Sequence, residues 1–428
     1  MNRFSLHFKR ICAACLGLFT QTLLPAQTTL TLEQCYTEAQ TNHPISGQKA
    51  VLQQTSALAI ANLQTNRWLP QLAVNGQASW QSEVTQLPIE IPNVAIPALS
   101  KDQYKLTLDA GYLLYDGSQT ALQREVQQAT TAVEEQRIEV ELHRLKDQVN
   151  TFFLNALLVD ENIRLTQTVL GDLQNRLAKL TASVRYGTAA QVNADALQAE
   201  SLRTEQQLAE LTANRRGIRD QLVLLTGLPV TDSTRLQLDN SPVNLEALPV
   251  ARPELKLYEA QRSLLSTQTR LISGKWQPRL SLFGQTGLGR PGLNFLDNRF
   301  RSFFIGGLRL NWNLSPAYTL RRERQIGQLK GQQVAIEQAT FEQNLSLQLR
   351  GQRAEIERLE AVIRKDREVV ALRSKIRQTA AVQFDNGAIA ARDYTAELNA
   401  ETQALLNQRV HEWQLALARI RYRTLTGN

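Results

Sequence analysis

Proline is absent from two long stretches of this sequence, and this absence constrains the fold more than any other feature. No proline occurs between Pro97 and Pro229, and none follows Pro316. Because proline breaks the interior of a helix, such stretches can hold very long helices. We predict one rod that begins at an N-cap, Ser118, and ends at Gly187, and a second of nearly the same length after Pro316. Each rod has about 67 residues and is roughly 100 Å long.

The two rods belong to two copies of one unit. Trp68-Leu69-Pro70-Gln71-Leu72 recurs as Trp276-Gln277-Pro278-Arg279-Leu280, and Tyr186-Gly187 and Phe384-Asp385-Asn386-Gly387 end the two rods. Each copy reads as a helix of about 35 residues, a strand, a loop, a strand, a rod, a turn and a helix of about 40 residues. The predicted organisation is a signal peptide (1–26), a first repeat (27–228), a linker (229–252) and a second repeat (253–428). In the first repeat we expect strands near 70–82 and 103–115 and a last helix at 188–226. In the second repeat we expect strands near 277–288 and 302–314 and a last helix at 388–426.

The first 26 residues are typical of a secretory signal. Three basic residues precede an apolar run from Ile11 to Leu24, and Leu24-Pro25-Ala26 fits a cleavage site. The run is short for the alternative, a transmembrane helix, and no later apolar run reaches spanning length. Cys12 and Cys15 would leave with the signal, so their spacing is no evidence of a redox or zinc site. Cys35 then stands alone and cannot form an intramolecular disulfide.

Four segments alternate apolar and polar residues, as the strands of a transmembrane barrel do over about ten residues. In the last of them, Leu310, Trp312 and Leu314 share one face, and Arg309, Asn311 and Asn313 share the other. We assign these three polar residues to the lumen of a barrel. Four of the five Trp residues lie in or beside the segments, as an interfacial aromatic girdle requires. The alternative, a soluble sandwich with a Trp core, has too few strands.

Four strands per chain cannot close a barrel alone. An open strand edge cannot stand in hydrocarbon, and a barrel of about eight strands is already filled by its own side chains. Two chains would therefore give a plugged barrel, whereas three chains would leave a lumen. We predict a homotrimer.

In this order, the residues resemble the TolC family of outer membrane efflux proteins, in the form found in Bacteroidetes-like bacteria. The resemblance rests on the Trp-x-Pro-x-Leu strand openings (68–72 and 276–280), on the Tyr/Phe-x-x-Gly turns near 184–187 and 383–387, the first of them shortened, and on the stretch from Asn386 to Asn399. It covers residues 28–428. It implies an α+β membrane protein: a trimer with a 12-stranded transmembrane β-barrel that continues into a long periplasmic α-helical barrel.

The resemblance also implies a function and a location. Such proteins are exit ducts in the cell outer membrane, in contact with its lipid, and they serve tripartite efflux or type I secretion together with an inner-membrane pump and a periplasmic adaptor. The competing hypothesis is a soluble periplasmic coiled-coil adaptor or scaffold. A porin without a tunnel would need more than four strands per chain.

In the family, the turns after the rods form a periplasmic tip that docks the adaptor and closes the pore. Carried over to this sequence, the candidate gate and docking residues are Tyr186, Gly187, Phe384, Asp385, Gly387 and Asp393. Some members ring the tip with aspartates that begin six residues after the turn glycine. That position is Asp393 in the second half but Asn193 in the first, and Ala396 stands three residues further on. The resemblance therefore implies a thinner acidic ring here.

Other chemistry is not indicated. Residues 287–292 spell G-x-G-x-x-G, but Pro291 and a loop follow instead of the helix that a dinucleotide site needs. The histidines at 43, 143 and 411 are scattered and lack the spacing of a metal site. The net charge of +8 is spread among mixed charges, which disfavours a nucleic-acid partner. We expect no enzymatic activity and no cofactor.

Overall fold

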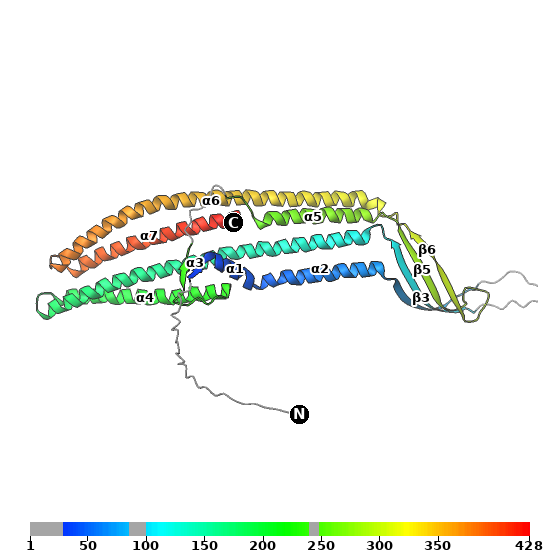
Figure 1. Ribbon diagram of the computed structural model, residues 1–428, viewed down its shortest axis with the longest axis horizontal. Helices are drawn as coiled ribbons and strands as arrows, with labels where there is room; N and C mark the ends of the chain where they lie inside the picture. Colours follow the sequence, from blue (N-terminus) through cyan, green and yellow to red (C-terminus); the bar gives the residue numbers. More distant parts are fainter. Residues whose placement is uncertain (1–28, 85–99, 239–247) are drawn as a thin grey trace, which may run out of the picture.

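The structure is a computed structural model that describes residues 29–84, 100–238 and 248–428. Long helices lie side by side along one axis, and a β-sheet extends from one end of them (Figure 1). The predicted signal peptide lies outside the described residues, and so does most of the loop at 82–101. The general prediction of a rod-like helical body joined to a small sheet is confirmed.

Each half of the chain contributes a helix, two strands, a rod and a final helix. The first half contains β1 (Thr29–Thr31), α1 (Leu32–Asn42), α2 (Pro44–Trp68), β2 (Gln71–Trp80), β3 (Asp102–Tyr115), α3 (Gln119–Arg185) and α4 (Gln191–Thr226). The second contains β4 (Arg235–Gln237), α5 (Pro253–Gly274), β5 (Arg279–Arg290), β6 (Arg301–Asn311), α6 (Ala317–Asp385) and α7 (Ala391–Thr426). The rods α3 and α6 have 67 and 69 residues, as predicted. Shorter helices lie end to end beside each rod, α4 with α2 and α7 with α5 (Figure 1).

The helices that precede the strands differ from the prediction of about 35 residues in each half. The first is split into α1 and α2 at His43, because Pro44 starts a new helix at its first position. The second, α5, has only 22 residues, since Pro253 fixes its start. The final helices begin at Gln191 and Ala391, three residues later than predicted, because each turn takes up the residues after its glycine.

The start of α3 also differs in detail. Ser118 is its N-cap, but its backbone is left-handed and its hydroxyl makes no capping bond. Asp116 takes over this task, since its Oδ2 accepts a hydrogen bond from the backbone N–H of Thr120 at 2.8 Å. A carboxylate suits this position, where backbone N–H groups lack partners within the helix.

The four long strands form one antiparallel sheet in the order β2-β3-β5-β6. The register pairs odd-numbered residues with odd-numbered ones: Asn75 lies opposite Thr107, Asp109 opposite Gln285, and Ser281 opposite Arg309. The odd-numbered residues therefore share one face of the sheet, up to the irregularity at the end of β3 where Tyr115 pairs with Leu280. Within the described residues, β2 and β6 each have one edge without a partner strand.

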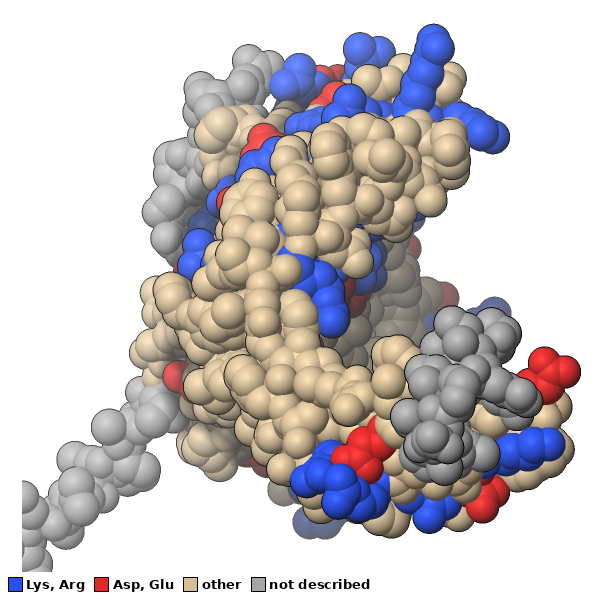
Figure 2. Space-filling model, turned by 90° about the vertical axis from the view of Figure 1, so that its right-hand side faces the viewer, with Lys and Arg blue, Asp and Glu red and all other residues tan. Residues whose placement is uncertain are grey.

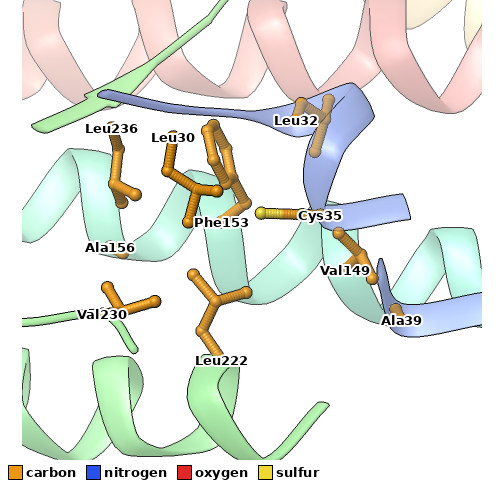
Figure 3. Close-up of a cluster of buried hydrophobic side chains, with 10 residues drawn as sticks. All are labelled: Leu30, Leu32, Cys35, Ala39, Val149, Phe153, Ala156, Leu222, Val230 and Leu236. Atoms are coloured by element: carbon orange, nitrogen blue, oxygen red, sulfur yellow. The ribbon is translucent and has the colours of Figure 1, made fainter. Parts of the chain in front are cut away.

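A buried cluster near the middle of the helical body joins the first half to the linker. β1 pairs in parallel with β4, a strand inside the linker, and Leu30 and Leu236 from these strands pack on Phe153 of α3 (Figure 3). Cys35 lies in this cluster fully buried, and burial raises the pKa of its thiol to about 12. The sequence analysis missed both short strands, because three residues are too few for alternation to show.

Candidate functional site

One face of the sheet is apolar and fully open to its surroundings. Its large side chains include Leu72, Val74, Trp80, Leu106, Leu108, Leu282, Leu288, Phe304, Leu308 and Leu310, all exposed. The exposed fractions of Val74 and Phe304 are 72% and 70%. A continuous exposed apolar surface of this kind marks an interface with another apolar medium.

The opposite face carries a polar network at its centre. The Asp109 carboxylate accepts hydrogen bonds from the side chains of Asn75, Thr107 and Gln285, which come from three neighbouring strands. Lys105 Nζ donates to Gln285 Oε1 at 3.4 Å. The sheet is thus polar on one side and apolar on the other, as the alternation predicts.

The three predicted lumen residues do not all lie within strand β6. Arg309 and Asn311 lie on the polar face of β6, and the Arg309 guanidinium stands 4.5 Å from the centroid of the Phe283 ring. Asn313 lies beyond the end of β6, where its Oδ1 accepts a hydrogen bond from the backbone N–H of Ser315 at 3.1 Å. The strand predicted to run to residue 314 therefore ends at Asn311, and Asn313 lies in the turn that starts α6; a position in the lumen stays a prediction for all three residues.

The two turns at the far ends of the rods have the same backbone. Gly187 and Gly387 have φ values of 70° and 72°, a left-handed conformation that glycine adopts without strain. The N–H of Gly187 donates to the carbonyl of Val184, and the N–H of Gly387 donates to that of Phe384, each at 2.9 Å. Both turns lie at the end of the molecule opposite the sheet (Figure 1).

The second turn is fixed by aromatic packing. The rings of Phe384 and Tyr394 stack at 5.3 Å between centroids, and Tyr394 is completely buried. Its hydroxyl donates a hydrogen bond to Asp172 Oδ2 of α3 at 2.6 Å. Burial raises the pKa of Tyr394, and this hydrogen bond to Asp172 raises it further. The turn of the second half is thereby anchored to the rod of the first.

Arg176 of α3 forms a second link between this rod and the second turn. Its Nη1 lies 2.8 Å from Asp385 Oδ1, its Nε lies 3.2 Å from Asp172 Oδ2, and its guanidinium stands 4.6 Å from the centroid of the Tyr394 ring. The sequence analysis named Phe384 and Asp385 but missed their partners. A signal was present, since an Asp–Arg pair four residues apart stands where the second rod has Leu372 and Ile376.

The first turn lacks such packing. Tyr186 is 81% exposed, and no described residue stacks on its ring. Asn193 Oδ1 accepts a hydrogen bond from the backbone N–H of Ala391 at 3.2 Å. Asn193 therefore caps the first turn of α7, a helix of the other half. Asp393, the equivalent residue of the second half, is exposed at the N-terminal turn of α7. Of the predicted gate residues, Phe384, Asp385 and Gly387 lie together in the second turn, Tyr186 and Gly187 lie in the first, and Asp393 is exposed on the first turn of α7.

Two absences bear on the site. In the parts of the chain that the structure describes, no three His, Cys, Asp or Glu side chains are grouped so that they could hold a metal ion. None of the helices in those same parts combines the length and the apolar character needed to cross a membrane.

Comparison with known proteins gives the fold. No protein-family model and no curated protein sequence matches this chain. Its structure is similar to that of CusC, a transmembrane channel, with a TM-score of 0.65 and 15% identity over 92% of this chain and 91% of that one. The outer-membrane channel OprN gives a TM-score of 0.65 and 14% identity over 93% and 90% of the two chains. The outer membrane channel MtrE of Neisseria gonorrhoeae gives 0.64 and 15% over 92% and 88%. The predicted TolC-like fold is confirmed.

Proposed function

We propose that this chain, which has the fold of outer membrane channels, is an exit duct in the outer membrane that drains a tripartite efflux or type I secretion system. The observation that carries the proposal is the two-sided sheet: an exposed apolar face outside and a hydrogen-bonded polar face inside. Such a sheet is stable when lipid covers one face and water the other. No catalytic role is proposed.

Three copies of the chain complete the duct. The open edges of β2 and β6 cannot remain unpaired in hydrocarbon, so β6 of one copy pairs with β2 of the next. The helices also support contact between copies. Two large apolar side chains of α6, Leu329 and Ile336, are 55% and 66% exposed in the single chain. A neighbouring copy would cover them.

The loops between the strands indicate which end of the duct faces the outside of the cell. β2 ends and β3 begins at the end of the sheet where β5 ends and β6 begins, and there the N–H of Ser100 donates to Asn298 Oδ1 at 3.3 Å. In this proposal that end faces the outside of the cell, and an epitope at Phe295 is labelled on intact cells. Labelling only after the outer membrane is ruptured would reverse the direction.

The two turns then form the periplasmic tip, which meets the adaptor protein and narrows the pore. If the Asn193 contact repeats around a ring of six hairpins, Asp393 reaches the N-terminus of α4 in the next copy. Such a position favours a carboxylate. Three copies of Asp393 near one axis also raise the local concentration of cations. Replacement Asp393→Asn in a planar bilayer separates the two roles: weaker block by multivalent cations supports the ring, and unchanged block leaves a helix cap.

Membrane fractionation tests the proposal against a soluble periplasmic adaptor or scaffold. We expect the protein to stay in the outer membrane during a carbonate wash, to migrate differently on gels with and without heating, and to form conducting pores in planar bilayers. Extraction by carbonate together with the absence of conductance would favour the soluble adaptor.

A further inference from the structure

The polar face of the sheet carries an excess of positive charge. By the register of the strands, five charged residues share this face: Lys105, Asp109, Arg279, Arg301 and Arg309. In the view onto the sheet end of the molecule, basic side chains project into the hollow, whereas the outer surface of the sheet is mostly free of charge (Figure 2). The balance on the polar face therefore depends on which of these charges have an opposite partner.

One basic residue is neutralised and three are not. Arg301 Nε lies 2.9 Å from Asp297 Oδ2, at the outer end of the sheet. For Lys105, Arg279 and Arg309, no described carboxylate lies within ion-pair distance. Instead, the Lys105 ammonium stands 5.2 Å from the centroid of the Phe303 ring, and Arg279 Nη2 donates to Gln119 Oε1 at 2.9 Å. These partners are neutral, so none of the three basic side chains forms a direct ion pair with a described carboxylate.

The single carboxylate on this face is itself held by neutral donors. Asp109 accepts from Asn75, Thr107 and Gln285 and forms no salt bridge with the described basic residues. It offsets only one of the three unpaired positive charges in each chain.

The positive charges stand near both ends of the strands. Lys105 pairs with Gly289 near the outer end of β5, whereas Arg309 pairs with Ser281 near its helical end. Eight residues of β-strand separate these two levels, which is about 26 Å. A solute that crosses the barrel of a trimer would meet basic side chains on entry and again on exit.

From this arrangement we propose that the barrel lumen selects anionic solutes, so that the cargo class of the duct is negatively charged. This proposal rests on the proposed function, because the polar face lines a lumen only in the closed barrel. Fixed charges that line a narrow passage concentrate ions of the opposite sign. Their effect falls with ionic strength, since the Debye length shrinks from about 30 Å at 0.01 M to about 10 Å at 0.1 M.

Ion selectivity of the full-length protein in planar bilayers tests the proposal. In a gradient of potassium chloride, we expect the reversal potential to show chloride passing more readily than potassium, most clearly at low salt. The double variant Lys105→Gln/Arg309→Gln should lower the chloride-to-potassium permeability ratio about twofold or more, because two of the three unpaired charges are lost. Arg309→Glu should lower it at least as far.

Lys365→Gln is the matched control, because it removes one exposed positive charge that pairs with Glu368 in α6, far from the barrel. It should leave the ratio unchanged, and light scattering should show the same assembly for every variant. Pores that still prefer potassium when Asp393→Asn is also present, or whose chloride-to-potassium ratio is unchanged in the barrel variants, would overturn the anion proposal while leaving the duct intact. Absence of any conductance would overturn the proposed function itself.

Discussion

The two rods of this chain have nearly the same length but very different surroundings. α3 buries fifteen of its residues and α6 only seven. α3 lies between α2 and α4 on one side and α5 and α7 on the other, whereas α6 packs mainly on α5 and α7 (Figure 1). The large apolar residues that stay exposed on the first half of α6 include Ile326, Leu329, Ile336 and Leu347. Within the described part of the single chain, this side of α6 has no helix packed on it, and in the proposed trimer another copy would cover it and also close the sheet.

The two turns make a second comparison between the halves. Their backbones match residue by residue, but only the second is braced, by Tyr394 and Arg176, which correspond to Ala194 and Ile376 in the other half. The repeat therefore specifies where the helices end, and the side chains specify how firmly each turn is held.

The largest expected effect comes from a charge placed on the exposed side of α6. Ile336→Asp should abolish most of the trimer, because an unpaired carboxylate buried in an apolar interface costs several kcal/mol. Ala335→Asp, which is also exposed but is rotated about 100° around the helix from Ile336, is the control and should leave the assembly intact. Size-exclusion chromatography in mild detergent measures both. A trimer that survives Ile336→Asp would mean that this side of α6 faces water.

Loss of the aromatic brace should come next. Tyr394→Ala removes a fully buried ring and should destabilise the second turn by about 3–5 kcal/mol. Tyr186→Ala removes an 81% exposed ring and should change stability by no more than about 0.5 kcal/mol. Hydrogen exchange at the start of α7 reports the first change, and exchange at the start of α4 reports the second. Equal protection losses in the two variants would contradict the asymmetry.

Loss of the link that Arg176 makes between the halves should reduce stability by a smaller amount. Arg176→Ala leaves Asp172 and Asp385 without their shared partner and should cost about 2 kcal/mol, less than a fully buried pair because the site is partly open to water. The control Ile376→Ala changes the equivalent position of the other rod. We expect Arg176→Ala to raise the resting conductance of the pore. If both variants conduct alike, the link does not hold the tip.

The smallest effect concerns pH. His143 of α3 is buried, whereas the equivalent Gln343 of α6 is exposed. Burial first, and then the positive charge of Arg252, lower the pKa of His143, and the hydrogen bond to the carbonyl of Thr424 offsets this only in part. The folded chain therefore binds fewer protons than the unfolded chain. The stability that this site contributes is present above about pH 6.5 and is lost as the pH falls below it.

Thermal unfolding followed between pH 7.5 and pH 5.5 measures this effect. His143→Gln should reduce the dependence of the melting temperature on pH, while Gln343→Ala should leave that dependence unchanged. A wild-type melting temperature that rises on acidification in this range, and does so only while His143 is present, would refute the assigned direction.

Much of the fold could be predicted from the sequence, because its signals are backbone signals. Prolines and turn glycines set the ends of the rods, and alternation set the faces of the strands. The Asp172–Arg176 pair is visible in the sequence, but its contacts with Tyr394 could not be predicted, because they form only when helices from both halves pack together. The pairing of β1 with β4 could not be predicted for a similar reason, because the paired residues are far apart in the sequence. Thr29, for example, pairs with Arg235, which is 206 residues later.

Closure of the barrel by three chains is the central claim, and the mass of the protein in solution tests it most directly. Light scattering on the detergent-purified protein, with the mass of bound detergent subtracted, should give three chains per particle. Three is the smallest number of chains that pairs the open edges of β2 and β6 and still leaves a lumen. A particle of one or two chains under the same conditions would contradict the account.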